Sequence, residues 1–414
     1  MLDLKCRTLA GASILVFLAG TTACSGQVES TPGDGGSEAS PDAPPFTGFE
    51  AGTFHEASLG PETSPGNGGD TCQGNPQSCI VPPSQPGSGA PAPSQHEYAV
   101  HKLYIGDTDR TGVSSPSAWK TYGYNLDGLV TTQSSTDVCT LAPGAARATQ
   151  VDGNGGIDNS FGENFLPILL TTAGTNVDQT INASIAEGHP TNLVYVSGFD
   201  GTPGATTSAV GLTAALFGGA DYAAVHGGAP SWNLGTHWPV APETLNGCPN
   251  GVCPSGTDPL AAAKVQVTGA YQSDGLFVGR APGAVAFGIL FSGQRLPLTI
   301  HDGVVTFSPT AGGVTNGTIA GALSTQELVN ALQQIAGAIS TSLCSGSAFD
   351  SIAQQIEQGS DILLQANGGI ANTPGVPCNA TSIGLGFDAT EIAVATPADI
   401  APPTPPAPNP CGDQ

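Results

Sequence analysis

The stretch Ala284–Phe307 reads AVAFGILFSGQRLPLTIHDGVVTF and contains three short apolar runs separated by two groups of turn-forming residues. The runs end at Phe291, Ile300 and Phe307, and the residues between them are Ser-Gly-Gln-Arg and His-Asp-Gly. Short runs rich in β-branched and aromatic residues, bounded by glycine turns, are typical of antiparallel strands. The stretch therefore predicts three consecutive strands joined by tight turns.

Similar runs lie on both sides of this stretch and extend the prediction to the whole body of the chain. They cover residues 97–105, 192–197, 264–271, 276–278, 382–387 and 392–394. Residues 205–260 are rich in Gly and Pro, and we interpret them as long loops. Several short strands with brief turns favour an antiparallel β-sandwich of the jelly-roll type.

Two helices are predicted after the β-rich region. Ser324-Thr-Gln-Glu327 matches a capping box, and apolar residues with helical spacing follow as far as Ile339. A second helical pattern runs from Ser347 to about Gln365 and ends before Asn367-Gly-Gly. We therefore predict a mainly β chain in which a C-terminal helical hairpin, near residues 324–366, packs on the sandwich.

The first residues have the organisation of an export signal. A short basic segment precedes an apolar run of about a dozen residues, and a spanning helix needs roughly 20. Leu18–Cys24, LAGTTAC, resembles a bacterial lipobox, which implies a lipid anchor on Cys24. The alternative is an ordinary secretory signal, because Thr21 stands where lipoboxes prefer an apolar residue. Ser25 fits the sorting pattern of outer-membrane lipoproteins, so we expect the outer membrane or cell surface, and otherwise secretion.

Composition divides the chain into four parts. We assign residues 1–23 to the signal peptide and residues 24–95 to a lipidated, disordered tether, because Gly, Pro and Ser dominate there and few apolar residues could form a core. Residues 96–396 form the β-sandwich body with its helices. Residues 397–414 form a Pro-rich tail.

Cysteine usage predicts disulfides. The chain has ten cysteines, and eight remain after Cys6 in the signal and Cys24 are set aside. An even number in an exported protein indicates disulfides, and short loops close at the least entropic cost. The expected pairs are Cys72–Cys79, Cys248–Cys253, Cys344–Cys378 and Cys139–Cys411. A zinc site at CPNGVC is excluded because the chain has no second pair of Cys or His residues at the spacing that zinc ligands need.

The net charge of −24, with only nine Lys and Arg, restricts the partners of the protein. Such a surface repels nucleic acids and anionic headgroups and attracts divalent cations or basic partners. We therefore expect no nucleic acid. The expected contacts are with the membrane through the lipid, and with a carbohydrate or a cell-surface protein.

An acidic glycine loop is the candidate metal site. Val151–Asp158 reads VDGNGGID and offers side-chain oxygens from Asp152, Asn154 and Asp158, the donors that Ca²⁺ prefers. The loop resembles EF-hand and dockerin loops over about seven residues, but the acidic fifth position and the terminal Glu are missing.

Other acidic turns could complete this site. We predict a composite, structural calcium site in which Asp107, Asp109 or Asp127 supplies the missing oxygens. The alternative is a set of separate turns whose Asp and Asn side chains cap their own backbone.

Trp232 and Trp238 lie in the 205–260 interval, where their rings could stack on a sugar; the alternative is that they are buried anchors for the loops. His96 and His101 are one residue too far apart for a metalloprotease HExxH motif, and their surroundings suit a strand. No catalytic residue set emerges. The leading hypothesis is a non-enzymatic surface protein that has a structural or binding role and is stabilised by calcium. The alternative is a secreted polysaccharide-acting hydrolase with its site in these loops, which would need two placed carboxylates.

One resemblance covers residues 98–395. It is carried by WKTYGYNLDGL from Trp119, DNSFGENFLPIL from Asp158, NGTIAGALSTQELVNALQQIAGAIS from Asn316 and CNATSIGLGFDA from Cys378. These stretches are similar to the large, uncharacterised exported lipoproteins of myxobacteria. The resemblance implies a cell-surface lipoprotein and brings no assigned reaction or catalytic residue.

Overall fold

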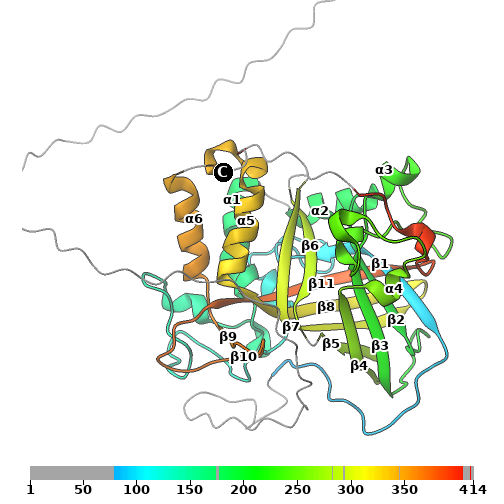
Figure 1. Cartoon of the computed structure of the whole chain (residues 1–414). Helices are drawn as coiled ribbons and strands as arrows, with labels where there is room; N and C mark the ends of the chain where they lie inside the picture. Colours follow the sequence, from blue (N-terminus) through cyan, green and yellow to red (C-terminus); the bar gives the residue numbers. More distant parts are fainter. Residues whose placement is uncertain are drawn as a thin grey trace, which may run out of the picture. The chain divides into compact units, whose positions relative to one another are not determined.

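The computed structural model describes residues 79–173, 177–281, 283–291, 294–344, 346–403 and residue 411. Within these residues, nine strands form one antiparallel sheet (Figure 1). They are β1 Gln95–Tyr104, β2 Asn192–Ser197, β3 Ala209–Gly218, β4 Val265–Ser273, β5 Leu276–Arg280, β6 Val285–Phe291, β7 Gln294–Thr310, β8 Gly313–Ser324 and β11 Ala380–Ile392. A separate pair consists of β9 Leu363–Leu364 and β10 Ile370–Ala371.

The large sheet closes on itself as a barrel. Its strands follow the order β1-β2-β3-β4-β5-β7-β8-β11, and β11 pairs with β1. These eight strands form a closed up-and-down ring, while β6 pairs with β7 outside the ring. The predicted β-sandwich is therefore wrong. A sandwich leaves free strand edges on both sheets, whereas here the two edges of one sheet hydrogen-bond to each other.

The closure depends on a bend in β7, where the sequence predicts a turn. Residues 294–300 of β7 pair with β6, residues 304–307 pair with β5, and β8 pairs with both halves. The register shifts between His301 and Val304, and Asp302 has a φ of 49°. This is a β-bulge, which bends a strand without reversing it. His-Asp-Gly therefore redirects β7 from one neighbour to another, and the two predicted strands are one.

The two-residue turn between β4 and β5 is of the kind that the sequence predicts. Ser273 pairs with Leu276, and the residues between them, Asp274 and Gly275, have φ values of 48° and 84°. Two successive positive φ angles define the type I′ hairpin turn, which Asp-Gly adopts readily.

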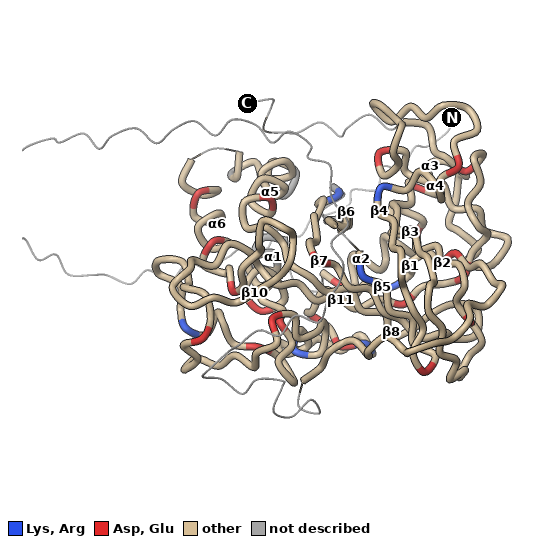
Figure 2. The backbone as a smooth tube through the Cα atoms, turned by 60° about the horizontal axis from the view of Figure 1, so that its bottom comes forward, with Lys and Arg blue, Asp and Glu red and all other residues tan. Residues whose placement is uncertain are grey.

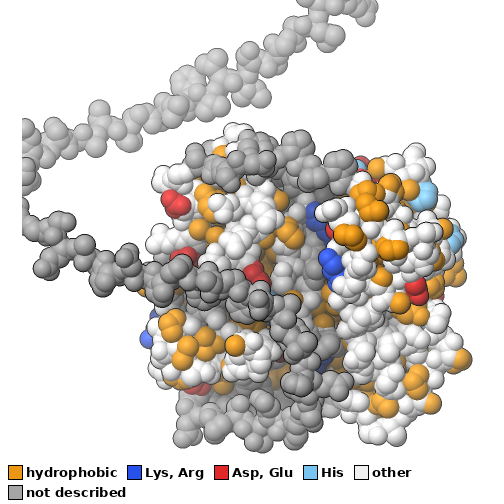
Figure 3. Space-filling view, viewed as in Figure 1, with side chains coloured by type: hydrophobic (Ala, Val, Ile, Leu, Met, Phe, Trp, Pro, Cys, Tyr) orange, Lys and Arg blue, Asp and Glu red, His pale blue; other side chains and the backbone are white. Residues whose placement is uncertain are grey.

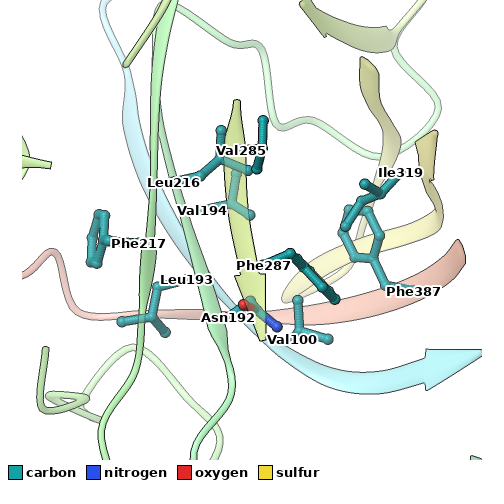
Figure 4. A pocket seen from close by; sticks show the side chains of 10 residues that line it. All are labelled: Val100, Asn192, Leu193, Val194, Leu216, Phe217, Val285, Phe287, Ile319 and Phe387. Carbon is teal, nitrogen blue, oxygen red and sulfur yellow. The ribbon is translucent and has the colours of Figure 1, made fainter. Parts of the chain in front are cut away.

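Side chains fill the inside of the barrel. The rings of Phe277 and Phe307 are stacked with centroids 4.5 Å apart, and Phe199 meets both at its edge. Tyr98 and Phe387 pack on the same group. A cavity of about 10 Å³ lies where Val285 and Phe287 of β6 meet the barrel strands (Figure 4), and this volume is about that of one water probe. The barrel interior is thus a packed core.

The outer face of β1, β2 and β3 is buried as well. Ala99, Leu193 and Phe217 form a second apolar cluster with residues of the segment between β3 and β4, among them Trp238 and Val240. Because both faces are covered, β2 reads as a continuous apolar run. The assignment of residues 205–260 to loops is wrong where β3 lies, since Ala209–Gly218 forms a central strand of the wall.

The helices are short and are spread along the chain. They are α1 Leu166–Ala173, α2 Val177–Ala186, α3 Tyr222–His226, α4 Pro259–Ala262, α5 Thr325–Ile339 and α6 Ser347–Gln358. Single 3₁₀ turns are Ala118–Thr121, Arg147–Gln150, Asn154–Gly156, Pro242–Thr244, Pro249–Gly251, Thr341–Leu343 and Pro397–Asp399, and Phe161–Phe165 is a π turn. Among the described residues, no helix has the length and apolar character needed to cross a membrane.

The predicted C-terminal helical hairpin on a sandwich is not established. Helix α5 packs on β7 of the barrel, α2 packs on β1 and β6, and α6 already ends at Gln358. Ser324 is the N-cap of α5, but its side chain makes no capping hydrogen bond. Glu327 instead lies 2.7 Å from Nε2 of His301, which explains why the predicted capping box does not form.

The disulfides confirm one predicted pair and correct two others. The structure joins Cys139 to Cys378, Cys248 to Cys253 and Cys344 to Cys411. The expected pairs Cys344–Cys378 and Cys139–Cys411 are wrong, because Thr140 and Pro377 form a parallel bridge that places Cys139 beside Cys378. Cys72 lies outside the described residues.

Both predicted flexible ends touch the body where they are described. In the segment assigned to the tether, the N–H of Ile80 donates to Gly155 and the carbonyl of Gly89 accepts from Val210. In the predicted tail, Ala401 donates to Val240. The signal peptide, Cys24 and residues 24–78 of the tether lie outside the described residues.

We expect the Cys139–Cys378 disulfide to stabilise the fold more than Cys248–Cys253. The first closes a sequence separation of 239 residues and the second one of 5, so their effects on the entropy of the unfolded chain differ. Replacing both cysteines by alanine should cost about 5 kcal/mol for the first pair and about 2 kcal/mol for the second. Urea unfolding of the two double variants measures this, and equal losses would contradict it.

Candidate site of buried carboxyl groups

Three of the six predicted calcium ligands come together in the structure. The carboxyl groups of Asp127, Asp152 and Asp158 lie close enough to raise one another's pKa. A fourth carboxyl group, that of Asp361, joins them. We call these four residues the carboxyl cluster. Figure 2 shows acidic residues concentrated in the part of the chain around β10.

Burial and mutual repulsion favour the neutral forms of the cluster. The pKa of Asp152 is raised to about 8, chiefly by burial and in part by the carboxylates of Asp127 and Asp361. Burial raises the pKa of Asp361 to about 7 and that of Asp158 well above its usual value. The side chains of Asp152 and Asp158 are hydrogen-bonded to each other, which requires a proton on one of them. The cluster therefore holds protons near neutral pH.

The cluster fastens several loops through their backbone. Asp158 accepts hydrogen bonds from the N–H of Leu126 at 2.6 Å, and Asp127 accepts one from Leu129 at 2.8 Å. The remaining bonds of the cluster run from Thr131 to Asp152, from Asn372 to Asp127 and from Ser382 to Asp361. These bonds join the loop before Thr132 to the VDGNGGID loop, and the cluster to strand β11.

The other three predicted ligands lie elsewhere. Asn154 is exposed in its 3₁₀ turn. Asp109 is exposed and accepts hydrogen bonds from the N–H groups of Thr111 and Val113, so it caps its own turn. Asp107 is buried and faces Asp178, not the cluster.

Asp107 and Asp178 form a separate acidic pair. Asp178 accepts hydrogen bonds from the N–H groups of Ile105 and Thr108 and from the hydroxyl of Thr108. The pKa of Asp178 is raised to about 8, chiefly by burial and next by its hydrogen bond with Asp107. Apart from this pairing, the oxygens of Asp107 have no hydrogen-bond partner among the described residues. Through its hydrogen bonds, Asp178 anchors the end of β1 to α2.

The chemistry available to the carboxyl cluster is charge compensation. Ionisation of two or more of its groups needs a cation close by, and carboxylate oxygens suit a hard ion. One oxygen of each carboxyl group accepts a backbone N–H, and side-chain donors bind the second oxygen of Asp127 and of Asp361. Within the described residues, no group of three or more His, Cys, Asp and Glu side chains has the arrangement of a metal centre.

Asp361 could not be identified from the sequence as a member of the cluster. It follows α6 and carries no loop motif, and it reaches the cluster because Ile362 and Ala380 pair. Its carboxylate accepts hydrogen bonds from the N–H and the hydroxyl of Ser382 on β11. Only the pairing of distant segments brings this residue to the site.

The two candidate stacking residues have different environments. Trp238 is 1% exposed, and its indole N–H donates to the carbonyl of Ala220 at 3.0 Å, so it anchors the loop over the outer face of the barrel. Trp232 is half-buried, with a φ of 52°, and packs against His101 and Trp238. Of the two, Trp232 alone offers part of its ring to a ligand.

Glu97 is a buried carboxyl group on the outer face of β1. It is 0% exposed, and one oxygen accepts a hydrogen bond from the N–H of Ala395 at 2.7 Å. The other oxygen has no partner among the described residues. Burial raises the pKa of Glu97 to about 8, and Asp399 adds to the rise. The neutral side chain holds the segment after β11 on the barrel.

Comparison with known proteins gives no relative. No family model matches the chain, and neither characterised proteins nor solved structures give a match. The resemblance to myxobacterial lipoproteins therefore stays a prediction.

We expect Glu97 to make the protein less stable as the pH rises. Its folded-state pKa of about 8 lies above the ordinary value of 4.5, so its stabilising effect is complete below pH 4.5 and is lost as the pH passes 8. Glu97→Gln stays neutral and should reduce the loss of unfolding free energy between pH 5 and pH 9 by roughly 2 to 5 kcal/mol. Urea unfolding at several pH values measures the difference.

The control is Glu357→Gln, which removes the same charge from an exposed position on α6. It should leave the pH dependence of the wild type unchanged. If the two variants follow the same curve, burial of Glu97 does not set this pH dependence.

Proposed function

We propose that this chain is a non-enzymatic, exported protein with a structural or binding role, displayed at the outer membrane or cell surface by a lipid on Cys24. The observation that carries the proposal is the carboxyl cluster, whose acidic groups are used to fasten loops of a packed barrel. Its proposed partners are the membrane, through the lipid, and a carbohydrate or another surface protein.

Disulfides support export. Three disulfides join described cysteines, and one of them links the connection between β1 and β2 to the connection between β8 and β11. Such bonds persist in oxidising compartments and are rare in the reducing cytosol. The apolar run and the lipobox resemblance at the N-terminus agree with this location.

A structural role is supported by what the polar groups of the cluster bind. Each of its four carboxyl groups accepts at least one hydrogen bond from another residue of the chain. Removing one such acceptor leaves a buried donor unpaired, at a cost of about 1 to 3 kcal/mol. The acidic residues of the loop that resembles a calcium site thus hold the connections between strands in place.

We propose Ca²⁺ as the cation that compensates the cluster when its groups ionise. The side chains of Asp152 and Asp158 are hydrogen-bonded to each other through a proton. A cation would replace this proton and bridge the oxygens of the two carboxyl groups. A hard divalent ion prefers such oxygens, and the net charge of −24 raises its concentration near the surface. Calcium would replace protons there, so its binding should strengthen as the pH rises.

The alternative is a secreted polysaccharide-acting hydrolase with its site in the loops of residues 205–260. It needs two carboxylates about 5 to 9 Å apart beside an accessible aromatic ring. Trp238 is buried and donates to Ala220, which leaves Trp232 as the ring for such a site. No specific observation favours this alternative.

Thermal unfolding tests the calcium proposal. The full chain carrying Cys24→Ser, which prevents lipidation, is unfolded with CaCl₂ and with chelator at pH 6 and pH 8.5. At a calcium concentration one hundred times the dissociation constant, the gain in unfolding free energy should be about 2.7 kcal/mol. We expect a higher melting temperature with calcium, and a larger rise at pH 8.5.

Two variants decide whether the cluster is responsible. Asp158→Asn should abolish the calcium-dependent rise, whereas Asp109→Asn makes the same substitution in an exposed turn and should keep it. Identical melting temperatures in calcium and chelator would contradict the proposal, as would an equal loss of the rise in both variants.

A further inference from the structure

Two of the few cationic residues of the chain meet at the rim of the barrel. Arg295 lies near the start of β7, and Lys264 directly precedes β4. Both contact Glu243: Nη1 of Arg295 lies 3.5 Å from its carboxylate, and Nζ of Lys264 donates to its carbonyl at 2.8 Å. Figure 3 shows Lys and Arg side chains gathered on one face of the molecule. The site combines two positive groups in a chain with a net charge of −24.

The backbone forms a glycine-lined seat for the guanidinium of Arg295. A Cβ at Gly288 of β6 would lie 1.9 Å from Nε of Arg295, and one at Gly218 of β3 would lie 2.7 Å from Nη2. A side chain at either of these two positions would displace the guanidinium. Asn192 of β2, which pairs with Gly218, holds β6 in place because its amide donates to the carbonyl of Gly288 at 3.1 Å. The guanidinium is thus confined between β3 and the hairpin of β6 and β7.

The donors of Arg295 are largely unused. Within the described part of the chain, the guanidinium donates no hydrogen bond, and its one ionic partner is the Glu243 carboxylate. The side chain of Arg295 is 27% exposed and that of Glu243 is 64% exposed. Burial lowers the pKa of Arg295, although a guanidinium keeps its charge at physiological pH. A confined cation with free donors and an exposed counter-ion is suited to an external acceptor.

We propose that Arg295 and Lys264 form a binding site for the oxyanion group of a small ligand, with a carboxylate as the preferred group. The planar guanidinium presents paired N–H groups that match two oxygens of one anion. Lys264 is exposed and has donors left for a third contact. The Glu243 carboxylate occupies the position of the ligand group in its absence and moves into solvent when the ligand binds.

The charge of the whole protein limits the kind of ligand. A net charge of −24 repels anions at distances where salt does not screen it, and the repulsion grows with each charge that the ligand carries. A ligand with a single anionic group therefore reaches the site more easily than a polyanion. The site selects a carboxylate on an otherwise neutral molecule.

Titration with simple anions tests the proposal. Sodium acetate, phosphate and sulfate are added to the full chain at constant ionic strength, and binding is measured by calorimetry and by the shift in melting temperature. We expect saturable binding of acetate, with weaker binding of the divalent anions. Tighter phosphate or sulfate binding at the same residues would assign the site to a tetrahedral oxyanion. Absence of saturable binding by all three anions would overturn the proposal.

Three variants locate the site. Arg295→Gln should abolish binding, while Arg147→Gln, which removes an exposed cation elsewhere, should not. Glu243→Gln removes the internal competitor and should lower the dissociation constant by up to about fivefold. Glu187→Gln, an exposed carboxylate of equal charge, should leave it unchanged.

Glu243→Gln keeps the proposal testable if Arg295→Gln does not fold, because Glu243 is largely exposed. Equal affinities for Glu243→Gln and Glu187→Gln would show that no anion displaces Glu243. That result, or binding that persists in Arg295→Gln, would overturn the proposal.

Discussion

The barrel depends on the bulge at Asp302 and Gly303, because this bend lets one strand serve two different neighbours. Before the bend β7 pairs with β6, and after it β7 pairs with β5 and completes the ring. A straight β7 would continue along β6 and leave the edge of β5 unpaired. Gly303 lies close under Val285, where a Cβ would come within 2.9 Å of that side chain. The bend therefore needs a small residue, and the packing of β6 across the barrel depends on it.

The bend also positions the glycine residues that surround Arg295. Because β6 leaves the ring, it lies against β3 and brings Gly288 beside Gly218, which forms the seat for Arg295. Acidic groups of the carboxyl cluster lie in the long connections between strands, where burial raises the pKa of Asp152 and Asp361. Those connections are held by neutral carboxyl groups and disulfides, so their stability responds to pH and to oxidation state.

Local patterns predicted those features that local chemistry controls. Asp274-Gly275 forms the expected hairpin turn, and Cys248 pairs with Cys253 across a short loop. The VDGNGGID loop places Asp152 and Asp158 in a common site, but Asn154 faces solvent. Prediction failed where a contact joins distant segments. Cys139 meets Cys378 through a bridge between two connections, and Asp361 reaches the cluster through the pairing of Ile362 with Ala380.

The sequence by itself determined a mainly β chain with disulfides, because strand periodicity, glycine turns and cysteine number are properties of short segments. The tertiary structure alone decided between a sandwich and a barrel. That choice depends on whether the strand containing His301-Asp302-Gly303 reverses or bends, and the same three residues permit both. Its outcome is set by the hydrogen bonds that β5 gains from β7 and by the aromatic core that closes around Phe307. Such interactions exist only once distant strands have met.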